Sequence, residues 1–223
     1  MFPTQPLKLA DCTSHGVDSQ AELFIVEGDS ASLSVCKLRN ERFQAVLPMQ
    51  GKPMNTLKCR EDRVRADPFF GALIDAIGSD ISSGTGGLFD LPCRYRQIVL
   101  LFDPDADGIH SATLMLIFFY RWMKPLLTAG QVSIVRPPMM EIIADTLATP
   151  LLAYTEVEGE RLCTDANGQR RPGYSKKRFR GLASFNADML HRCCVNPTTR
   201  SISRLTVRDA ESSIQIMATF EGK

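Results

Sequence analysis

The sequence predicts an α/β fold with a mostly parallel sheet flanked by helices. Strand-like and helix-like segments alternate through the first 140 residues, which is typical of a doubly wound sheet. The segment 98–102 is continuously apolar, as expected for a strand that is buried on both faces. It runs directly into the acidic turn 103–108, and the carboxyl ends of parallel strands are where such folds bind their ligands.

The alternation can be assigned element by element. Strands are predicted at 21–26, 43–48, 97–102 and 132–135. Helices are predicted at 29–39, 57–65, 69–77, 110–129 and from about Asp209 onward. Asp29 or Ser30 is expected to cap the first helix, and Asn55 the second. Gly78 and Gly130 are expected to end the third and fourth helices, Gly78 as a left-handed cap.

Length and composition limit the class of protein. A chain of 223 residues with 44% hydrophobic residues can bury the core of one domain and carry an appendage. We expect a lead-in at 1–20, a metal-binding domain at 21–140 and a C-terminal tail at 141–223. The loop at 79–87 is rich in Ser and Gly but too irregular to cradle a phosphate. No segment has the ~18 uninterrupted apolar residues of a membrane span, and the N-terminus lacks the apolar core of a signal peptide.

The seven cysteines are scattered without framework spacing, which indicates free thiols in a reducing cytoplasm. Two groups suggest zinc at first sight: Cys193 and Cys194 with His191, and Cys12 with His15. Neither group has the C-x₂-C spacing of a structural zinc site. Both are therefore expected to contain buried or spectator thiols.

Asp103, Asp105 and Asp107 alternate along the turn that follows the third predicted strand. An EF-hand calcium loop is the rival interpretation, but its twelfth position would be Leu114 instead of a bidentate Glu. The preceding segment is also a strand, whereas an EF-hand needs a helix there. A merely solvated acidic turn is the other alternative, although three crowded carboxylates repel one another unless a cation lies between them. The turn therefore predicts a site for a hard divalent cation.

A second acidic segment, containing Glu27 and Asp29, follows the first predicted strand. Because the carboxyl ends of parallel strands share one edge of the sheet, the two acidic segments are expected to converge. Oxygen ligands without His or Cys favour Mg²⁺ over zinc. Mg²⁺ held in this way completes its coordination with water and phosphate oxygens, which predicts chemistry on a phosphoryl or phosphodiester group.

Four motifs occur in order along the chain. They are Glu27-Gly28-Asp29-Ser30-Ala31, Leu47-Pro48-x-x-Gly51-Lys52, Asp103-x-Asp105-x-Asp107-Gly108-x-His110 and Arg178-Phe179-Arg180-Gly181-Leu182. Together they resemble the TOPRIM module of the B subunits of DNA gyrase and topoisomerase IV, and the resemblance spans nearly the whole chain. It implies a Rossmann-like TOPRIM fold and the function of a type IIA DNA topoisomerase.

The resemblance also implies roles for the acids. Glu27, Asp103 and Asp105 would bind the catalytic Mg²⁺, for which Mn²⁺ can substitute, while Asp107 would support a second, weaker metal position together with Asp105. Glu27 would also serve as the general acid/base for the ribose oxygen that leaves and returns. The attacking nucleophile would be a tyrosine of a partner, a gyrase A-like subunit.

Lys52 and His110 are expected to assist electrostatically at the phosphate. The alternatives are an ordinary solvated lysine and a surface histidine at the start of a helix, and residue type alone leaves both open.

A basic segment without any acid lies in the tail. Its members are Arg170, Arg171, Lys176, Lys177, Arg178 and Arg180. With aromatic residues interleaved, such a segment suits a phosphate backbone, so Lys176, Lys177, Arg178 and Arg180 are expected to contact DNA together with Lys52. A solvated loop is the alternative. No residue is assigned to base reading, so sequence specificity is not expected.

The chain departs from the family pattern around these acids. The changed positions are Ser32-Leu33, Gln50, Met140-Glu141 and Ala183-Ser184-Phe185. These changes suit an active divergent enzyme, or a protein that binds Mg²⁺ and DNA but cleaves poorly. The ATPase and transducer domains that precede this module in the family have no room in the chain. It is therefore expected neither to hydrolyse ATP nor to drive strand passage.

The sequence therefore predicts the DNA-cleavage half-site of a type IIA topoisomerase, cytoplasmic and nucleoid-associated, whose partners are DNA and a gyrase A-like subunit. Two alternatives remain: a non-catalytic module that binds DNA or the A-type subunit, and a stand-alone TOPRIM nuclease. The final helix, with Ile214, Met217 and Ala218 on one face, is expected to pack against the domain instead of docking a partner.

Overall fold

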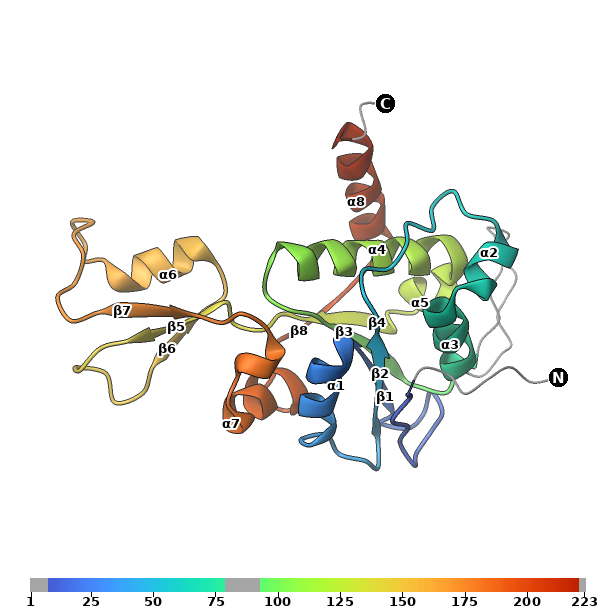
Figure 1. The fold of residues 1–223 in the computed structure, drawn as a ribbon, viewed down its shortest axis with the longest axis horizontal. Helices are drawn as coiled ribbons and strands as arrows, with labels where there is room; N and C mark the ends of the chain where they lie inside the picture. Colours follow the sequence, from blue (N-terminus) through green and yellow to red (C-terminus); the bar gives the residue numbers. More distant parts are fainter. Residues whose placement is uncertain (1–7, 79–92, 221–223) are drawn as a thin grey trace.

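The computed structural model describes residues 8–78 and 93–220, and a five-stranded sheet lies at its centre (Figure 1). The strand order is β2-β1-β3-β4-β8. The first four strands are parallel, and β8 joins β4 in the antiparallel direction. The strands are β1 (Glu22–Glu27), β2 (Gln44–Met49), β3 (Gln97–Leu101), β4 (Val132–Val135) and β8 (Ile202–Arg204). The predicted class, an α/β fold with a mostly parallel sheet flanked by helices, is confirmed.

Both faces of the four parallel strands are buried, which explains why these strands are apolar at successive positions. On β1, Leu23 and Ile25 pack on one face, and Phe24 and Val26 pack on the other. The first face is covered by α2 (Glu61–Ala66), α3 (Pro68–Ile77), α4 (Ala106–Trp122) and α5 (Lys124–Thr128). The second face is covered by α1 (Gly28–Cys36), α7 (Ala187–Leu190) and the π-helical turn His191–Val195.

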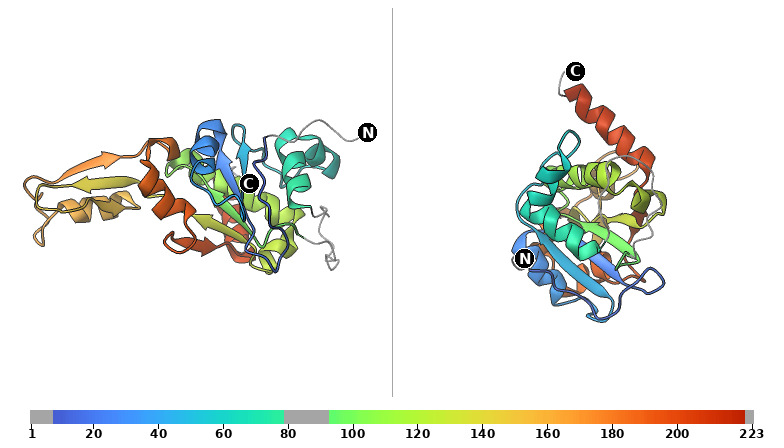
Figure 2. Two further views of the ribbon diagram at one scale, coloured as in Figure 1. Left: turned by 90° about the horizontal axis from the view of Figure 1, so that it is seen from below. Right: turned by 90° about the vertical axis from the view of Figure 1, so that its right-hand side faces the viewer.

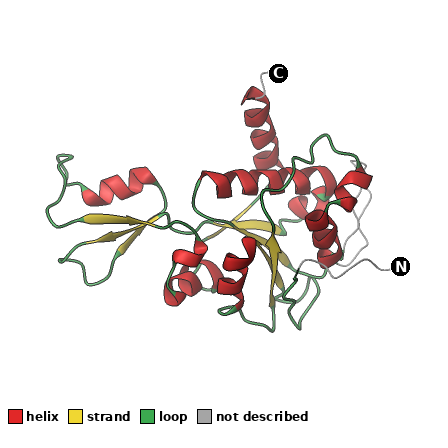
Figure 3. Cartoon of the chain, viewed as in Figure 1, coloured by secondary structure: helices red, strands yellow, loops and turns green. Residues whose placement is uncertain are grey.

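A second, smaller sheet lies apart from the first, as the two groups of strands in Figure 3 show. It is antiparallel in the order β6-β5-β7 and projects from one end of the molecule (Figure 1). Its elements are β5 (Met140–Ile143), β6 (Leu151–Ala153), β7 (Ser175–Arg178) and α6 (Glu156–Cys163). Its core is small and is formed by Met140, Ile142, Ala153 and Cys163.

After β7 the chain returns to the main sheet through a short 3₁₀ helix, Leu182–Ser184, and α7. It then adds β8 to the sheet edge and ends in α8 (Val207–Phe220), which packs beside α4 and α5. Ala210 is fully buried there, but the later part of α8 extends away from the body (Figure 2, right). The chain segment predicted as a tail therefore supplies part of the main sheet.

Two predicted helix starts are wrong. α1 begins at Gly28, preceded by Glu27, and neither Asp29 nor Ser30 caps it. The side chain of Asp29 instead accepts a hydrogen bond from Gln50 Nε2 at 2.8 Å. The charged helix expected at 57–65 is the shorter α2, because the Asn55 side chain binds the backbone N–H of Leu57 and forms a local turn.

The helix predicted at 110–129 is two helices. α4 begins four residues earlier than expected because the Asp105 side chain caps it by accepting from the N–H of Gly108. It ends at Trp122, and Met123 separates it from α5 with φ −138° and ψ 41°. Pro125, which lacks an N–H and clashes with a preceding helical turn, explains the break.

Other local predictions are confirmed. α3 ends where expected, with Gly78 in the left-handed region at φ 72°. The loop predicted at 79–87 lies outside the described residues. Among the helices that are described, none combines the length and the apolar character needed to cross a membrane.

Candidate metal centre at the acidic sheet edge

The two acidic segments follow neighbouring parallel strands. β1 and β3 pair with Val26 opposite Leu101, so Glu27 and Asp103 leave the sheet at the same edge. Asp105 and Asp107 follow in the turn that leads into α4. This edge combines the ends of two hydrogen-bonded strands with the N-terminus of a long helix, which is where open α/β sheets bind ligands.

Glu27 is half-buried, and its Oε2 atom is buried without a hydrogen-bond partner among the described residues. Burial raises the pKa of this carboxyl, and the charges of Asp103, Asp105 and Asp107 raise it further, against a smaller opposing effect of Lys52. A buried carboxylate oxygen without a donor is unfavourable in the charged form unless a cation approaches it.

Asp103 is also half-buried, and burial raises the pKa of its carboxyl. Its Oδ1 accepts a hydrogen bond of 2.8 Å from the backbone N–H of Leu182, which opposes that effect, while Asp105 adds to it. The donor belongs to the chain segment that returns from the small sheet. This contact was not predicted, although the sequence motif that contains Leu182 marked the segment.

Asp105 and Gly108 shape the turn between them. Asp105 Oδ1 accepts the Gly108 N–H at 2.8 Å, which leaves its second carboxylate oxygen outside the cap. A Cβ atom at position 108 would lie only 2.1 Å from the backbone oxygen of Asp103. The acidic turn can therefore close this tightly only with glycine at that position.

Lys52 and His110 lie at the exposed rim of this edge. Lys52 Nζ contacts Asp107 Oδ1 at 2.7 Å, and this hydrogen bond and its charge lower the pKa of Asp107. His110 is exposed on the first turns of α4, and its charge makes a smaller contribution in the same direction. Asp29 faces Gln50 and, at 3.6 Å, Lys8.

The donor set fits a hard cation by its chemistry, because it consists of carboxylate oxygens and includes the unpartnered oxygen of Glu27. These acids influence one another electrostatically. In the described part of the chain, however, no three of them bring one carboxylate oxygen each to within 4.8 Å of the other two. Carboxylates repel one another, so a bound cation would have to draw these side chains together.

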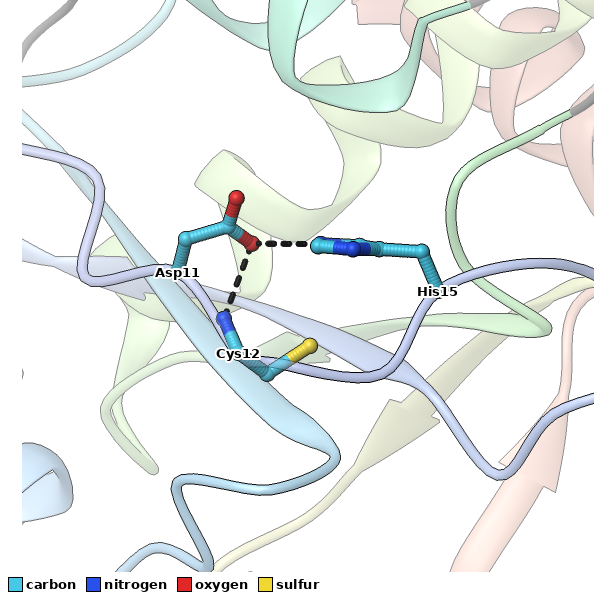
Figure 4. A group of neighbouring side chains, drawn as sticks. All are labelled: Asp11, Cys12 and His15. Carbon is cyan, nitrogen blue, oxygen red and sulfur yellow. Dashed lines mark hydrogen bonds and ion pairs between the residues drawn. The ribbon is translucent and has the colours of Figure 1, made fainter.

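Within the described residues, Asp11, Cys12 and His15 do bring one possible ligand atom each to within 4.8 Å of one another (Figure 4). Asp11 accepts hydrogen bonds from the Cys12 N–H and from the side chains of Arg94 and Tyr95, and its Oδ1 lies 3.1 Å from His15 Nε2. These bonds outweigh its burial and lower the pKa of Asp11 to about 2. Because the Arg94 cation already occupies the carboxylate, the cluster is best explained as a structural junction between the lead-in and the segment that precedes β3.

Three cations of the basic segment are compensated within the small sheet. Lys176 pairs with Glu160, and Arg178 pairs with Glu156, both acids on α6. Lys177 lies 3.7 Å from Glu141 of β5. Arg180 is exposed, and no ion pair is found for it in the described parts of the chain. No local pattern in the sequence indicates that acids from a separate helix pair with these cations.

The fold and this edge define a class of protein: a doubly wound α/β domain with clustered acids at the carboxyl ends of its strands. The profile of the Toprim domain family matches residues 22–137, and the chain belongs to this family. It is 39% identical over 217 residues to the DNA gyrase B subunit of Staphylococcus aureus and, to the same extent, to that of Staphylococcus epidermidis. Each alignment covers 97% of this chain and 32% of the relative, so the chain spans about a third of their length. The resemblance to the gyrase B module is confirmed.

Proposed function

We propose that this chain supplies the metal-binding half of a DNA cleavage and religation site, as in a type IIA topoisomerase. The main supporting observation is that Glu27 lies at the same sheet edge as Asp103 and Asp105, and that its Oε2 atom is buried without a hydrogen-bond partner among the described residues. The charges of both aspartates raise the pKa of Glu27. Glu27, Asp103 and Asp105 would hold Mg²⁺, or Mn²⁺ in its place, and Asp105 with Asp107 would hold a second, weaker ion. When bound, such an ion neutralises charge that develops on a phosphodiester oxygen.

Glu27 is the group best suited to move a proton. Without a cation, burial and the neighbouring acids raise the pKa of its carboxyl above the ordinary value. We assign it the role of general acid/base at the ribose oxygen. Lys52, through its charge next to Asp107, and His110 on the same rim would attract and orient the DNA phosphate.

DNA would be bound without sequence specificity through its phosphates. Arg180 has no ion pair in the described parts of the chain, whereas Lys52, Lys176, Lys177 and Arg178 would first have to leave their acidic partners. The nucleophile would come from a gyrase A-like subunit. In this chain Tyr95 is fully buried and donates to Asp11, so this tyrosine is not placed to attack DNA. Buried thiols at Cys163 and Cys194 support a reducing, cytoplasmic location.

The test is to incubate the full chain with a gyrase A-like subunit, supercoiled DNA and Mg²⁺ or Mn²⁺, and to assay protein-linked breaks after denaturation. We expect tyrosine-linked breaks that disappear with a chelator and with Glu27→Gln. Binding to DNA or to the A-type partner without breaks would contradict this function and indicate the non-catalytic module. Breaks without the A-type partner would instead indicate the stand-alone nuclease.

A further inference from the structure

We propose that Gly181 is a positioning residue for the candidate metal centre, because the absence of a side chain there lets the tail hold the Asp103 carboxylate in one orientation. The inference rests on the proposed function and goes beyond it, since the family assignment of Asp103 says nothing about what holds it. Gly181 belongs to the segment between β7 and the 3₁₀ helix, far from Asp103 in the sequence.

The contact between the two segments is close. A Cβ atom built at position 181 would lie 2.6 Å from Oδ2 of Asp103, and 3.1 Å and 3.2 Å from its Cγ and Oδ1. The next residue, Leu182, donates its backbone N–H to Oδ1 at 2.8 Å. The carboxylate thus lies directly against the Gly181 backbone while one of its oxygens is fixed by a hydrogen bond.

The requirement for glycine is one of space and not of backbone conformation. Gly181 has φ 170° and ψ 173°, an extended conformation that any residue can adopt. An added methyl group would displace the end of a short side chain, which costs the fold little but moves the carboxylate. The predicted consequence is therefore an altered site on an intact protein.

The segment that carries Gly181 is held firmly on both sides. Phe179 and Phe185 are buried and stack with their ring centroids 4.3 Å apart. Leu182 is 1% exposed and packs in the core on the second face of the sheet. Ser184 Oγ donates to the Gly181 carbonyl oxygen. The Leu182 N–H is thus a fixed donor, of the kind that outer-shell groups provide for metal ligands.

The experiment measures Mn²⁺ affinity of the full chain by the electron paramagnetic resonance signal of free Mn²⁺, without DNA or partner. We expect Gly181→Ala to weaken binding about tenfold, the lower end for loss of an outer-shell contact. In an Asp103→Asn background the same change should have no further effect. Thermal unfolding should show that Gly181→Ala remains folded.

Gly159→Ala is the matched control, because its Cβ would lie 2.2 Å from the sulfur of Met140 in the small sheet, away from the acids. It should leave Mn²⁺ affinity unchanged. Ser184→Ala provides a second test without added bulk and should weaken Mn²⁺ binding by a smaller factor.

The outcomes separate the two proposals. Wild-type affinity in both Gly181→Ala and Ser184→Ala would overturn the positioning role while leaving the metal site in place. If Gly181→Ala weakened Mn²⁺ binding equally in the Asp103→Asn background, the positioning role would also be overturned, because the effect would not act through Asp103. Wild-type affinity in Asp103→Asn alone would refute the metal assignment, and with it this inference.

Discussion

Strand β1 carries a glutamate at each end, and the two side chains have opposite fates. Glu22 is buried at the start of the strand and is paired with Arg200 and with Gln44. Glu27, roughly 17 Å away at ~3.3 Å per residue, has a buried oxygen without a partner and three acids nearby. The first glutamate links β1 to the segment that precedes β8, and the second is the one that we propose as a metal ligand. The difference shows that compensation of the charge, and not burial, separates a structural acid from a candidate ligand.

The largest expected effect is at the start of β1, where the charge of Glu22 is compensated. The Arg200 side chain is 2% exposed and donates to Glu22 and to the carbonyl oxygen of Val195. Arg200→Met leaves the Glu22 charge buried with only Gln44 beside it, and should lower the free energy of unfolding by about 3–5 kcal/mol. Urea denaturation measures this loss.

The double variant Glu22→Leu with Arg200→Met should regain much of that stability, because no uncompensated charge remains. Mn²⁺ affinity of the double variant should equal that of the wild type. A single variant as stable as the wild type would show that the compensation at Glu22 is unimportant.

The next largest effect is expected at the acidic sheet edge, where the charges of the carboxylates are not compensated. Asp105→Asn and Asp105→Ala both remove a charge, so each should weaken Mn²⁺ binding at least about tenfold and abolish metal-dependent cleavage. Only alanine removes the α4 cap, which should cost ~1 kcal/mol and lower the melting temperature by about 2–4 °C. Unchanged Mn²⁺ affinity in both variants would contradict the assignment of Asp105.

A smaller effect is expected at the small sheet, where charges are compensated but exposed. Exposed ion pairs are weak, so Glu156→Gln with Glu160→Gln should raise affinity for a short DNA duplex about threefold to tenfold at low salt. Fluorescence anisotropy measures this change. The matched control is Glu61→Gln with Asp62→Asn on α2, which removes the same charge elsewhere. An equal gain in the control would mean that only net charge matters.

The smallest effect is a pH dependence at Asp11. Its pKa is lowered from 3.8 to about 2 by hydrogen bonds, so its contribution to stability is complete above pH ~4 and is lost as the pH falls towards 2. Because the side chain is about one-third exposed, the contribution should be ~1 kcal/mol. The stability difference between wild type and Asp11→Asn, measured in urea at several pH values, should narrow over that interval. A stability difference that stays constant with pH would contradict this role of Asp11.

The sequence was sufficient for features set by neighbouring residues. The apolar runs of β1 and β3, the left-handed Gly78 and the acidic turn at one sheet edge all depend on local pattern. Contacts between distant segments could not be predicted from the sequence, because no local pattern of residues indicates them. The Glu22–Arg200 pair and the Asp103–Leu182 contact, separated by 178 and 79 positions, are examples.

Some departures from the family pattern acquire a physical reason only in the structure. Gln50, where a basic residue is usual, donates to Asp29. Glu141 lies beside Lys177 on the neighbouring strand and compensates part of its charge. Ser184 bonds back to Gly181 and so helps to fix the loop against Asp103. Leu33 is 63% exposed on α1, and nothing in the described residues explains it.

The central claim is that the uncompensated acids of the main sheet hold a divalent cation. Anomalous diffraction from crystals soaked in Mn²⁺ tests it most directly. We predict an anomalous peak bounded by the carboxylates of Glu27, Asp103 and Asp105. Density at Asp11, Cys12 and His15 with none at the acidic edge, or no peak at all, would contradict the account.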